Sequence, residues 1–332
     1  MIDFVARLRT WFAIVLAWCF AAIPSGGAAG EEPPVPAEAA KMGPVTFAVI
    51  GDFGLDIWKP KSNPDDGSKP HERRNPYQAA VADLVAGWKP DFVISTGDNN
   101  YPKGEAATID ANIGKYYASF IGNYKGIHGP GAKDNRFFPV LGNHDWDAPG
   151  QGCKPYLEYF TLPGNERYYD FVWGPVHFFM LDNDGREPDG AKAGSKQHQW
   201  FIKAAEASRS PFQVVVAHHP PYSSGEHGGI KGTDWDFEKQ GVDLMLCGHD
   251  HNYERIRQDG ITYVVNGAGG GNLRRFKEPV EGSEMRYRDK HGAQRVEVKP
   301  AAGKPGSWEL TSTFIDVDGK EIDAFSITAA AK

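Results

Sequence analysis

Short runs of apolar residues recur along the chain, and several of them stop at a glycine that is followed by polar side chains. Runs of this length, rich in β-branched and aromatic residues, are typical of buried β-strands. Five such runs stand out: Phe47–Ile50, Phe92–Ile94, Phe137–Leu141, Val214–Ala217 and Leu244–Cys247. The pattern therefore predicts five buried strands, spread over most of the chain.

Helical spacing appears between these runs. Asn75-Pro76 combines a capping side chain with a proline at the first helical position, and apolar residues follow at helical spacing over Val81–Trp88. With the strands before and after it, this helix predicts a β-α-β unit. Further helices are predicted at 106–121 and 195–207.

The second half of the chain also carries hairpin signals. Hairpins are predicted at 168–182 and at 309–328, the second turning at Asp318-Gly319, and a strand is predicted at Ile261–Val265. The segment 278–306 is charged and irregular, so we expect a long loop there. No internal repeat and no second domain are evident.

The bulk composition limits the kind of protein this can be. The chain has 332 residues, of which 40% are hydrophobic, and this is enough for one large α/β domain. Its net charge is -7 and it has no basic stripe, so we expect no nucleic-acid partner. Outside the N-terminal segment only Cys153 and Cys247 remain, and we expect no structural disulfide.

The N-terminus has the form of an export signal. Arg7 and Arg9 precede an apolar stretch, Trp11–Ile23, that is short for a membrane span, and small residues follow up to Ala29. We therefore expect a signal peptide at 1–29, a Pro/Ala-rich linker at 30–44 and a single domain at 45–330. The alternative is an uncleaved anchor. The prediction is a secreted or periplasmic protein with no stable membrane association after cleavage.

Side chains that bind metals follow each of the five predicted strands. They are Asp52; Asp98, Asn99, Asn100 and Tyr101; Asn143, His144 and Asp145; His218 and His219; and His249, Asp250 and His251. Ligands at the ends of several strands of one sheet converge at one edge. This nitrogen and oxygen set suits iron, manganese or zinc and argues against a thiolate site. If 248–251 is extended, His249 and His251 share a face and Asp250 points away.

The order of these motifs resembles the purple acid phosphatases, within the binuclear metallophosphoesterases. The family pattern is matched in order by Gly51-Asp52-Phe53-Gly54, Gly97-Asp98-Asn99-Asn100-Tyr101, Gly142-Asn143-His144-Asp145, His218, and Gly248-His249-Asp250-His251. Ala217–Pro220, Glu226–Gly228 and Gly267–Gly269 are similar to segments of the short, tartrate-resistant type. The resemblance covers residues 45–327.

The resemblance implies a fold, two metals and a set of roles. The fold is a four-layer α/β/β/α sandwich of two mixed sheets flanked by helices. The implied ferric ligands are Asp52, Asp98, Tyr101 and His251, and the implied ligands of a divalent Fe, Zn or Mn are Asp98 as a bridge, Asn143, His218 and His249. A bridging hydroxide is the implied nucleophile. His144 and His227 are placed beside the substrate phosphate, and Asp145 is expected to orient His144.

The choice between His218 and His219 rests on the motif. Adjacent strand residues face opposite ways, so only one of the two is expected to be a ligand. The resemblance selects His218, the residue two before Pro220.

The resulting hypothesis is an acid phosphatase that hydrolyses phosphate monoesters. Its expected partners are small phosphate esters, phosphoproteins among them, and it is expected to be a monomer. The alternatives are a phosphodiesterase or Mn/Zn metallophosphoesterase without ferric iron, and a non-catalytic binding protein on the same fold. Tyr101 favours ferric iron, because related enzymes without it generally lack a tyrosine there. The segment 183–196 is shorter than the regulatory loop that the tartrate-resistant type carries there.

Overall fold

A computed structural model describes residues 41–55, 75–230 and 235–331. All of these belong to one compact unit, Glu32–Lys332. The predicted signal peptide and most of the predicted linker lie outside the described residues. Among the described residues, no helix combines the length and apolarity needed to cross a bilayer.

The first sheet is built around the predicted β-α-β unit. Its six strands lie in the order β13-β12-β11-β1-β2-β3, where the first three pair antiparallel and β1, β2 and β3 run parallel. Their bounds are β1 Val45–Ile50, β2 Phe92–Ser95, β3 Phe137–Pro139, β11 Gly292–Pro300, β12 Ser307–Asp316 and β13 Glu321–Ala330. The parallel strands place the carboxyl ends of β1, β2 and β3 at one edge.

The second sheet has seven strands in the order β10-β8-β9-β7-β6-β5-β4. β5, β6, β7 and β9 run parallel, whereas β4, β8 and β10 are antiparallel to their neighbours. Their bounds are β4 Tyr169–Trp173, β5 Val176–Met180, β6 Phe212–Val216, β7 Leu244–Cys247, β8 Tyr253–Gln258, β9 Ile261–Asn266 and β10 Ser283–Tyr287. Both sheets are therefore mixed, as predicted.

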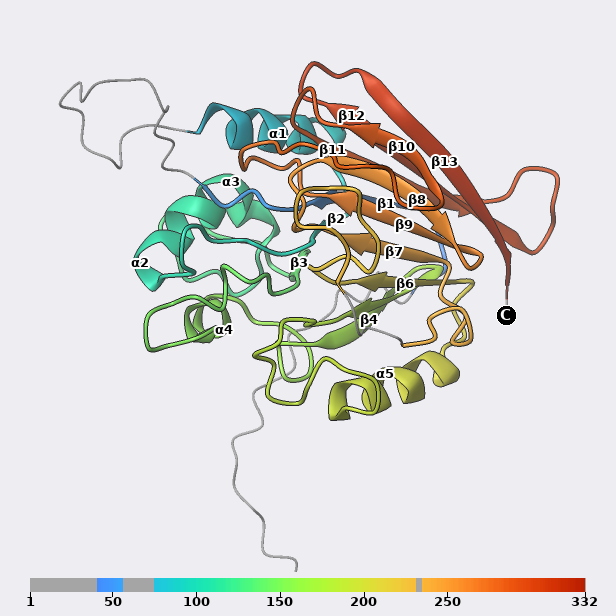
Figure 1. Cartoon of the computed structure of the whole chain (residues 1–332), viewed down its shortest axis with the longest axis horizontal. Coiled ribbons are helices and arrows are strands. Elements are labelled where there is room, and N and C mark those ends of the chain that lie inside the picture. Colours follow the sequence, from blue (N-terminus) through green and yellow to red (C-terminus); the bar gives the residue numbers. More distant parts are fainter. Residues whose placement is uncertain (1–40, 56–74, 231–234, 332) are drawn as a thin grey trace, which may run out of the picture. The chain divides into compact units, whose positions relative to one another are not determined.

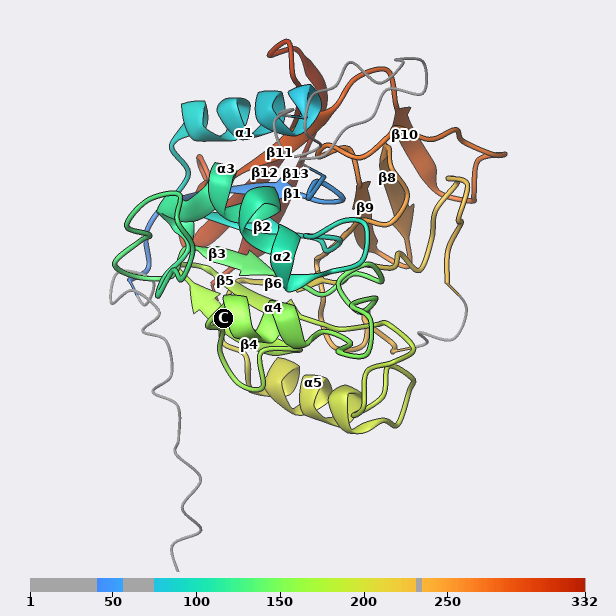
Figure 2. The same cartoon turned by 90° about the vertical axis from the view of Figure 1, so that its left-hand side faces the viewer.

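The alternation of side chains along each strand separates the layers. In β5 and β6, Phe178 and Val214 belong to the large core shared with the first sheet, whereas their neighbours Phe179 and Val215 pack with Phe201 of α5. Figures 1 and 2 show α1 and α5 on opposite sides of the two sheets. The helices are α1 Pro76–Trp88, α2 Ala106–Ile109, α3 Lys115–Tyr117, α4 Lys154–Tyr159 and α5 Lys196–Ala207. The predicted sandwich of two mixed sheets flanked by helices is confirmed.

The start of α1 follows the predicted capping chemistry. The Asn75 side chain accepts hydrogen bonds from the backbone N–H groups of Tyr77 and Gln78, and Pro76 occupies the first turn. The Asn75 amide also donates to the carbonyl oxygens of Leu55 and Gly270. The cap therefore ties the helix to the loops that follow β1 and β9.

Two sequence-based expectations were wrong. The single helix at 106–121 is divided into α2, a π-helical turn at Asp110–Gly114, α3 and a 3₁₀ turn at Ala118–Phe120. The long loop expected at 278–306 contains the whole of β10 and of β11. In β11, charged residues alternate with buried Val296 and Val298, and pairing with β1 and β12 overrides the charged composition.

Both cysteines outside the N-terminal segment are buried free thiols, Cys153 and Cys247, so the expectation of no structural disulfide between them is met.

Candidate metal centre

The strand ends of both sheets meet at one site. Asp52 and Asp98 follow β1 and β2, Asn143 comes after β3, and His218 and His249 follow β6 and β7. One carboxylate oxygen each of Asp52 and Asp98 and one ring nitrogen of His218 lie within 4.8 Å of one another. The structure therefore brings together residues separated by up to 199 positions in the chain, Asp52 to His251.

Three of these residues adopt left-handed backbone angles, which non-glycine residues rarely do. The φ angles are 54° at Asp52, 51° at Asp98 and 70° at His249. Hydrogen bonds hold the geometry: Asp52 N–H donates to the Gly97 carbonyl at 3.0 Å, and His249 N–H donates to the Asp52 carboxylate at 2.9 Å. Such conformations are enriched at functional sites because the surrounding structure must impose them.

The expected extended shape of 248–251 was wrong. The backbone of His249 is in the left-handed region. The N–H of Asp250 donates a hydrogen bond to the carbonyl of Gly248 at 2.9 Å, which makes a tight turn. His249 and His251 still face the site, but they contact different groups. Asp250 does point away from the site, because its carboxylate accepts hydrogen bonds from Ser223 Oγ and from the backbone of His227.

One half of the site is rich in oxygen. We call it the tyrosine side: Asp52, Asp98, Tyr101 and His251. The Tyr101 hydroxyl lies 2.8 Å from Asp98 Oδ2, 3.2 Å from Asp52 Oδ1 and 3.1 Å from His251 Nε2. All four residues are buried. Their ligand atoms therefore converge on one small volume.

Electrostatics on the tyrosine side oppose ionisation of the phenol. Burial and the carboxylates of Asp98 and Asp52 raise the pKa of Tyr101 well above its usual value. Burial alone would also raise the pKa of Asp52, but the hydrogen bond and charge of His251 lower it strongly. Asp52 is thus a carboxylate at ordinary pH, and Tyr101 needs a nearby cation to become a phenolate.

The other half of the site is rich in imidazole. We call it the histidine side: Asn143, His218, His219 and His249. His218 Nε2 lies 3.2 Å from Asn143 Oδ1 and 3.5 Å from Asp98 Oδ2. Ring nitrogens of His218, His219 and His249 lie within 4.8 Å of one another. Asp98 therefore stands between the two halves, since its Oδ2 faces both Tyr101 and His218.

The orientation of the rings suits metal binding. His218 Nδ1 lies 2.9 Å from the Thr96 carbonyl, and His251 Nδ1 lies 2.9 Å from the Asn272 carbonyl. A carbonyl can only accept, so each Nδ1 carries a proton and Nε2 is the nitrogen that faces the site. Burial opposes protonation of His218 and His251, but the nearby carboxylates raise the pKa of both, so a bound metal would have to displace the proton from Nε2. Burial and His218 lower the pKa of His219 to about 3, and burial with His218 and His219 lowers that of His249 to about 2. These two imidazoles are therefore neutral, as metal ligands must be.

His144 and His227 lie at the opening of the site. The His144 ring packs against Tyr101, its Nδ1 is 2.6 Å from the Pro102 carbonyl and its Nε2 is 3.9 Å from Asp98 Oδ2. The His227 ring packs against His249 with 4.3 Å between centroids. The two histidines therefore border the tyrosine side and the histidine side respectively.

The proposed role of Asp145 was wrong. Its buried carboxylate accepts hydrogen bonds from the backbone N–H groups of Asn99, Asn100 and Gly142, and the His144 ring instead bonds Pro102. Burial and the charge of Asp98 raise the pKa of Asp145 to about 6. Asp145 therefore holds the turn between Asp98 and Tyr101 rather than orienting His144.

Two positioning residues were missed by sequence reasoning. Asn183 donates to the His219 carbonyl at 2.7 Å and accepts from the His219 N–H at 3.0 Å. Arg186 donates to the Asn143 carbonyl at 2.8 Å and to Asp147 at 2.6 Å, and it pairs with Asp184. The segment after β5 thus joins the loops that carry Asn143 and His219. No local sequence motif predicts these contacts.

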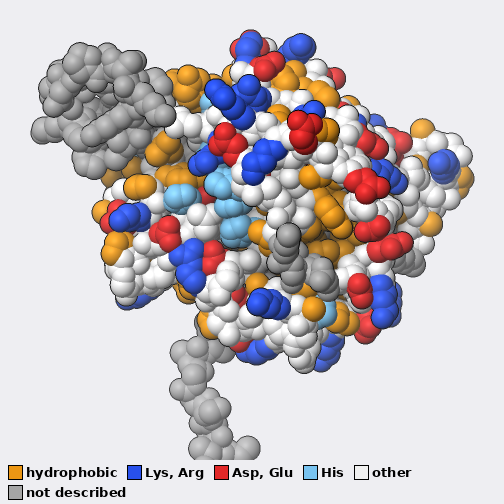
Figure 3. Space-filling model, viewed as in Figure 1, with side chains coloured by type: hydrophobic (Ala, Val, Ile, Leu, Met, Phe, Trp, Pro, Cys, Tyr) orange, Lys and Arg blue, Asp and Glu red, His pale blue; other side chains and the backbone are white. Residues whose placement is uncertain are grey.

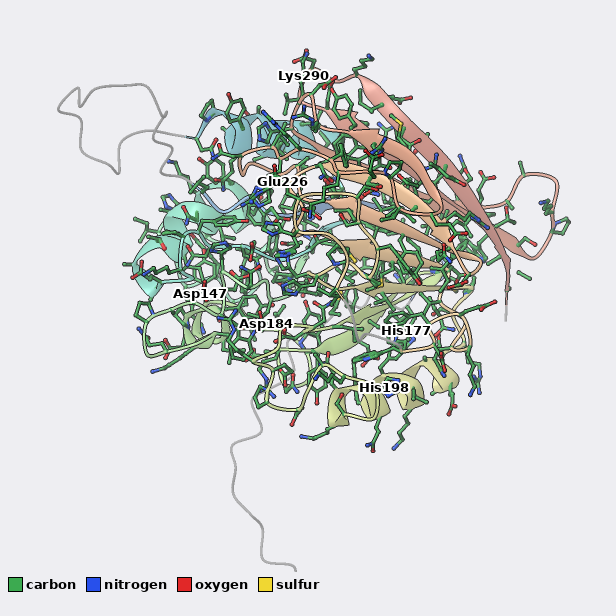
Figure 4. All side chains as sticks on the ribbon, in the orientation of Figure 1. Asp147, His177, Asp184, His198, Glu226 and Lys290 are labelled. Carbon is green, nitrogen blue, oxygen red and sulfur yellow. The ribbon has the colours of Figure 1, made fainter. Side chains whose placement is uncertain are left out.

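The surface view places the site in its surroundings. Figure 3 shows histidine side chains gathered on one face, with charged side chains around them. In Figure 4, Glu226 lies on one side of this region and Asp147 and Asp184 lie on the other, whereas His177 and His198 lie near α5. His177 pairs with Asp170 at 2.8 Å, and the His198 ring packs against Trp235, so both have structural roles.

Comparisons with known proteins agree with this geometry. Residues 45–253 match the family model described as calcineurin-like phosphoesterase. The chain is 25% identical to human tartrate-resistant acid phosphatase type 5 over 269 residues, which cover 70% of this chain and 77% of that protein. It is 26% identical to purple acid phosphatase 17 of Arabidopsis thaliana over 270 residues, covering 72% of each.

A solved structure, the purple acid phosphatase PPD1 from yellow lupin seeds, has the same fold with a TM-score of 0.65 at 20% identity. The alignment covers 89% of this chain but 55% of the lupin chain, so our chain spans about half of that protein. The family match covers well over half of our chain, and the donors of the site fit a metal-dependent hydrolase. The protein belongs to the calcineurin-like phosphoesterase family and is homologous to the tartrate-resistant and purple acid phosphatases.

Proposed function

We propose that this phosphoesterase is an acid phosphatase that hydrolyses phosphate monoesters with a ferric–divalent metal pair. The observation that carries the proposal is the position of the Tyr101 hydroxyl, in contact with two carboxylates and the Nε2 of His251. In this surrounding the phenol ionises only beside a strongly charged cation, and this favours Fe(III) on the tyrosine side. The histidine side would hold the divalent ion, Fe, Zn or Mn.

In this proposal one group of residues binds the metals and another contacts the substrate. When bound, the two cations supply charge stabilisation for the phosphoryl group and activate the attacking water. Asp52, Tyr101 and His251 would hold one of them, and Asn143, His218 and His249 the other, with Asp98 between. The proposed roles need Nε2 of His218 and His251 as the ligand atom, and this is the nitrogen left facing the site because Nδ1 of each ring donates to a backbone carbonyl.

His144 and His227 are proposed to act on the substrate. As cations they can donate hydrogen bonds to the phosphoryl oxygens, and His227 can protonate the departing alkoxide. Desolvation and the nearby charge of Arg274 lower the pKa of His227. Because a lowered pKa shifts protonation to lower pH, His227 becomes an effective acid only as the solution becomes acidic. This agrees with an acid phosphatase.

The remaining proposals concern the location, oligomeric state and substrates of the enzyme. We propose that it is exported, loses residues 1–29 and acts as a monomer without stable membrane association. Its proposed substrates are small phosphate esters, and phosphoproteins whose phosphate can reach the open histidine side. Support comes from the composition of the N-terminal segment and from the exposure of His227.

The test combines metal analysis, the visible spectrum and substrate preference of the purified holoprotein. We expect one iron and one divalent ion per chain, a violet band, and faster hydrolysis of p-nitrophenyl phosphate than of bis(p-nitrophenyl) phosphate at acid pH. A colourless Mn or Zn protein that prefers the diester would support the alternative without ferric iron. Metal binding with no hydrolysis of either ester would support a binding protein instead.

A further inference from the structure

His219 is the histidine of this site that the family pattern leaves without a role. β6 ends at Val216, so His218 and His219 both lie beyond the strand, and the rule that neighbours face opposite sides does not apply to them. The ring centroids of His219 and His249 are 4.4 Å apart, and those of His218 and His219 are 4.9 Å apart. The three rings form one cluster.

The side chain of Asn183 sets which nitrogen of His219 faces that cluster. Its amide nitrogen donates to the His219 carbonyl, so the assignment of its oxygen is fixed. That oxygen then faces both the His219 backbone N–H, at 3.0 Å, and the ring Nδ1, at 3.2 Å. Because this oxygen can only accept, Nδ1 carries the proton and Nε2 keeps its lone pair.

The distances meet the requirement for a shared ion. One ring nitrogen each of His218, His219 and His249 lies within 4.8 Å of the others, and His218 also belongs to the group formed with Asp52 and Asp98. Ligands about 2.0–2.1 Å from a zinc ion can be up to roughly 4 Å apart, so small side-chain movements would close the cluster around one ion. The two groups share His218, which places this ion next to the tyrosine side.

We propose that His219 is a third imidazole ligand of the divalent ion, beside His218 and His249. The inference rests on the proposed metal-dependent function and adds to it a preference among metals. Imidazole suits Zn(II) and Fe(II), whereas Mn(II) is better served by carboxylate, carbonyl and water. Three imidazoles therefore favour Zn(II) or Fe(II) over Mn(II) on the histidine side.

The experiment is calorimetric titration of the metal-free protein with Zn²⁺ and, separately, with Mn²⁺. The variants are His219→Ala, His219→Asn and Asn183→Ala. His218→Ala is the comparison at a ligand that the proposed function already includes, and His198→Ala is a control remote from the site. We expect His219→Ala to weaken Zn²⁺ binding about tenfold or more, and Mn²⁺ binding less. His219→Asn, which offers an amide oxygen, should lose Zn²⁺ affinity but keep most of the Mn²⁺ affinity. Asn183→Ala should also weaken Zn²⁺ binding. The affinity of His198→Ala for both ions should match that of the wild type.

Several outcomes would overturn the inference. If His218→Ala loses Zn²⁺ while His219→Ala and Asn183→Ala both bind it like the wild type, His219 is not a ligand and the proposed function stands. If His219→Ala keeps Zn²⁺ affinity but the zinc-loaded protein binds inorganic phosphate more weakly, His219 contacts substrate instead. If the wild type binds Mn²⁺ but not Zn²⁺, the inferred metal preference is wrong and the proposed function stands. If it binds neither ion, the proposed function fails as well. Circular dichroism checks the fold, and His219→Asn and Asn183→Ala decide the matter if His219→Ala does not fold.

Discussion

The tyrosine side and the histidine side share Asp98 but differ in chemistry and in exposure. Asp52, Tyr101 and His251 are buried, whereas Asn143, His219 and His249 are partly open to solvent. The first half offers two carboxylates and a phenol, and the second offers mainly imidazoles. A hard trivalent ion is best held in the first, and a borderline divalent ion that substrate can reach is best held in the second. The proposed assignment of the two metal ions to the two halves thus rests on burial as well as on ligand type.

The largest effect is expected where the two halves meet. His218→Ala removes a nitrogen that faces both Asn143 and Asp98, so the divalent ion should be lost and turnover should fall by more than about a hundredfold. Metal analysis and phosphatase assays check this, with His198→Ala as the control. Full iron and zinc content in the His218 variant would show that the histidine side is not organised around this residue.

His227→Ala should have the next largest effect, and it should depend on the leaving group. General acid catalysis contributes on the order of a hundredfold to ten-thousandfold, and it matters most when the departing alkoxide is a strong base. We expect a large loss with alkyl phosphates, a small loss with nitrophenyl phosphate and unchanged metal content.

The same loss on both ester types would leave His227 with phosphate binding alone, and loss of metal would make it a ligand. Asp250→Asn is a matched test of how His227 is positioned, because the Asp250 carboxylate accepts hydrogen bonds from the N–H groups of His227 and Gly228. It should show the same dependence on the leaving group, with a smaller magnitude.

Tyr101→Phe tests the tyrosine side by itself. The violet band expected of the proposed centre should disappear, because a phenolate beside iron would be its source, while most of the fold should remain. Turnover should fall less than in the His227 variant on alkyl phosphates, since Asp52, Asp98 and His251 still remain. Visible absorption and circular dichroism are the measurements, with Tyr124→Phe as a tyrosine control outside the site. An unchanged band would exclude Tyr101 as the coloured ligand.

The smallest expected effect is on stability at acid pH and leaves the metal site unchanged. Burial opposes ionisation of Asp110, but hydrogen bonds from Tyr124, the Ile127 N–H and Tyr159 lower its pKa below 3.8. A lowered folded-state pKa contributes stability that is present above 3.8 and is lost as pH falls through the folded value.

Asp110→Asn should therefore flatten the loss of thermal stability below pH 3.8 and leave metal content unchanged. Thermal melts over acid pH, compared with the wild type, measure this. An identical pH profile in both proteins would show that Asp110 does not contribute to acid sensitivity.

The parts that sequence reasoning reached were those with local signals. The strands before Asp52, Asp98 and His249 are short apolar runs, and the Asn75 cap has its own signature. Because parallel strands end at one edge of a sheet, the sequence predicts that Asp52 lies near Asp98 and that His218 lies near His249. The expectation of a single sheet was wrong, because β1, β2 and β3 belong to one sheet and β6 and β7 to the other.

The parts that it missed depend on contacts between distant segments. Asn183 and His219 are 36 positions apart, and Arg186 and Asn143 are 43 positions apart. Contacts over such separations produce no local motif or hydrophobic periodicity in the sequence. β11 was missed because pairing with β1 and β12, not composition, makes it a strand. The turn at His249 was missed because hydrogen bonding to Asp52 imposes a backbone angle that histidine does not prefer.

The left-handed backbone of Asp52, Asp98 and His249 has an evolutionary consequence. Such angles cost roughly 1–2 kcal/mol per residue, against a typical total stability of about 5–15 kcal/mol. Glycine accepts the same angles readily, and at each of these positions it would delete a proposed ligand. Selection for heat resistance alone, without selection for activity, should therefore enrich glycine early at position 249, where the hydrogen bond to Asp52 comes from the backbone and is kept. Single steps of this kind would turn an enzyme lineage into a stable, inert scaffold lineage with the same fold.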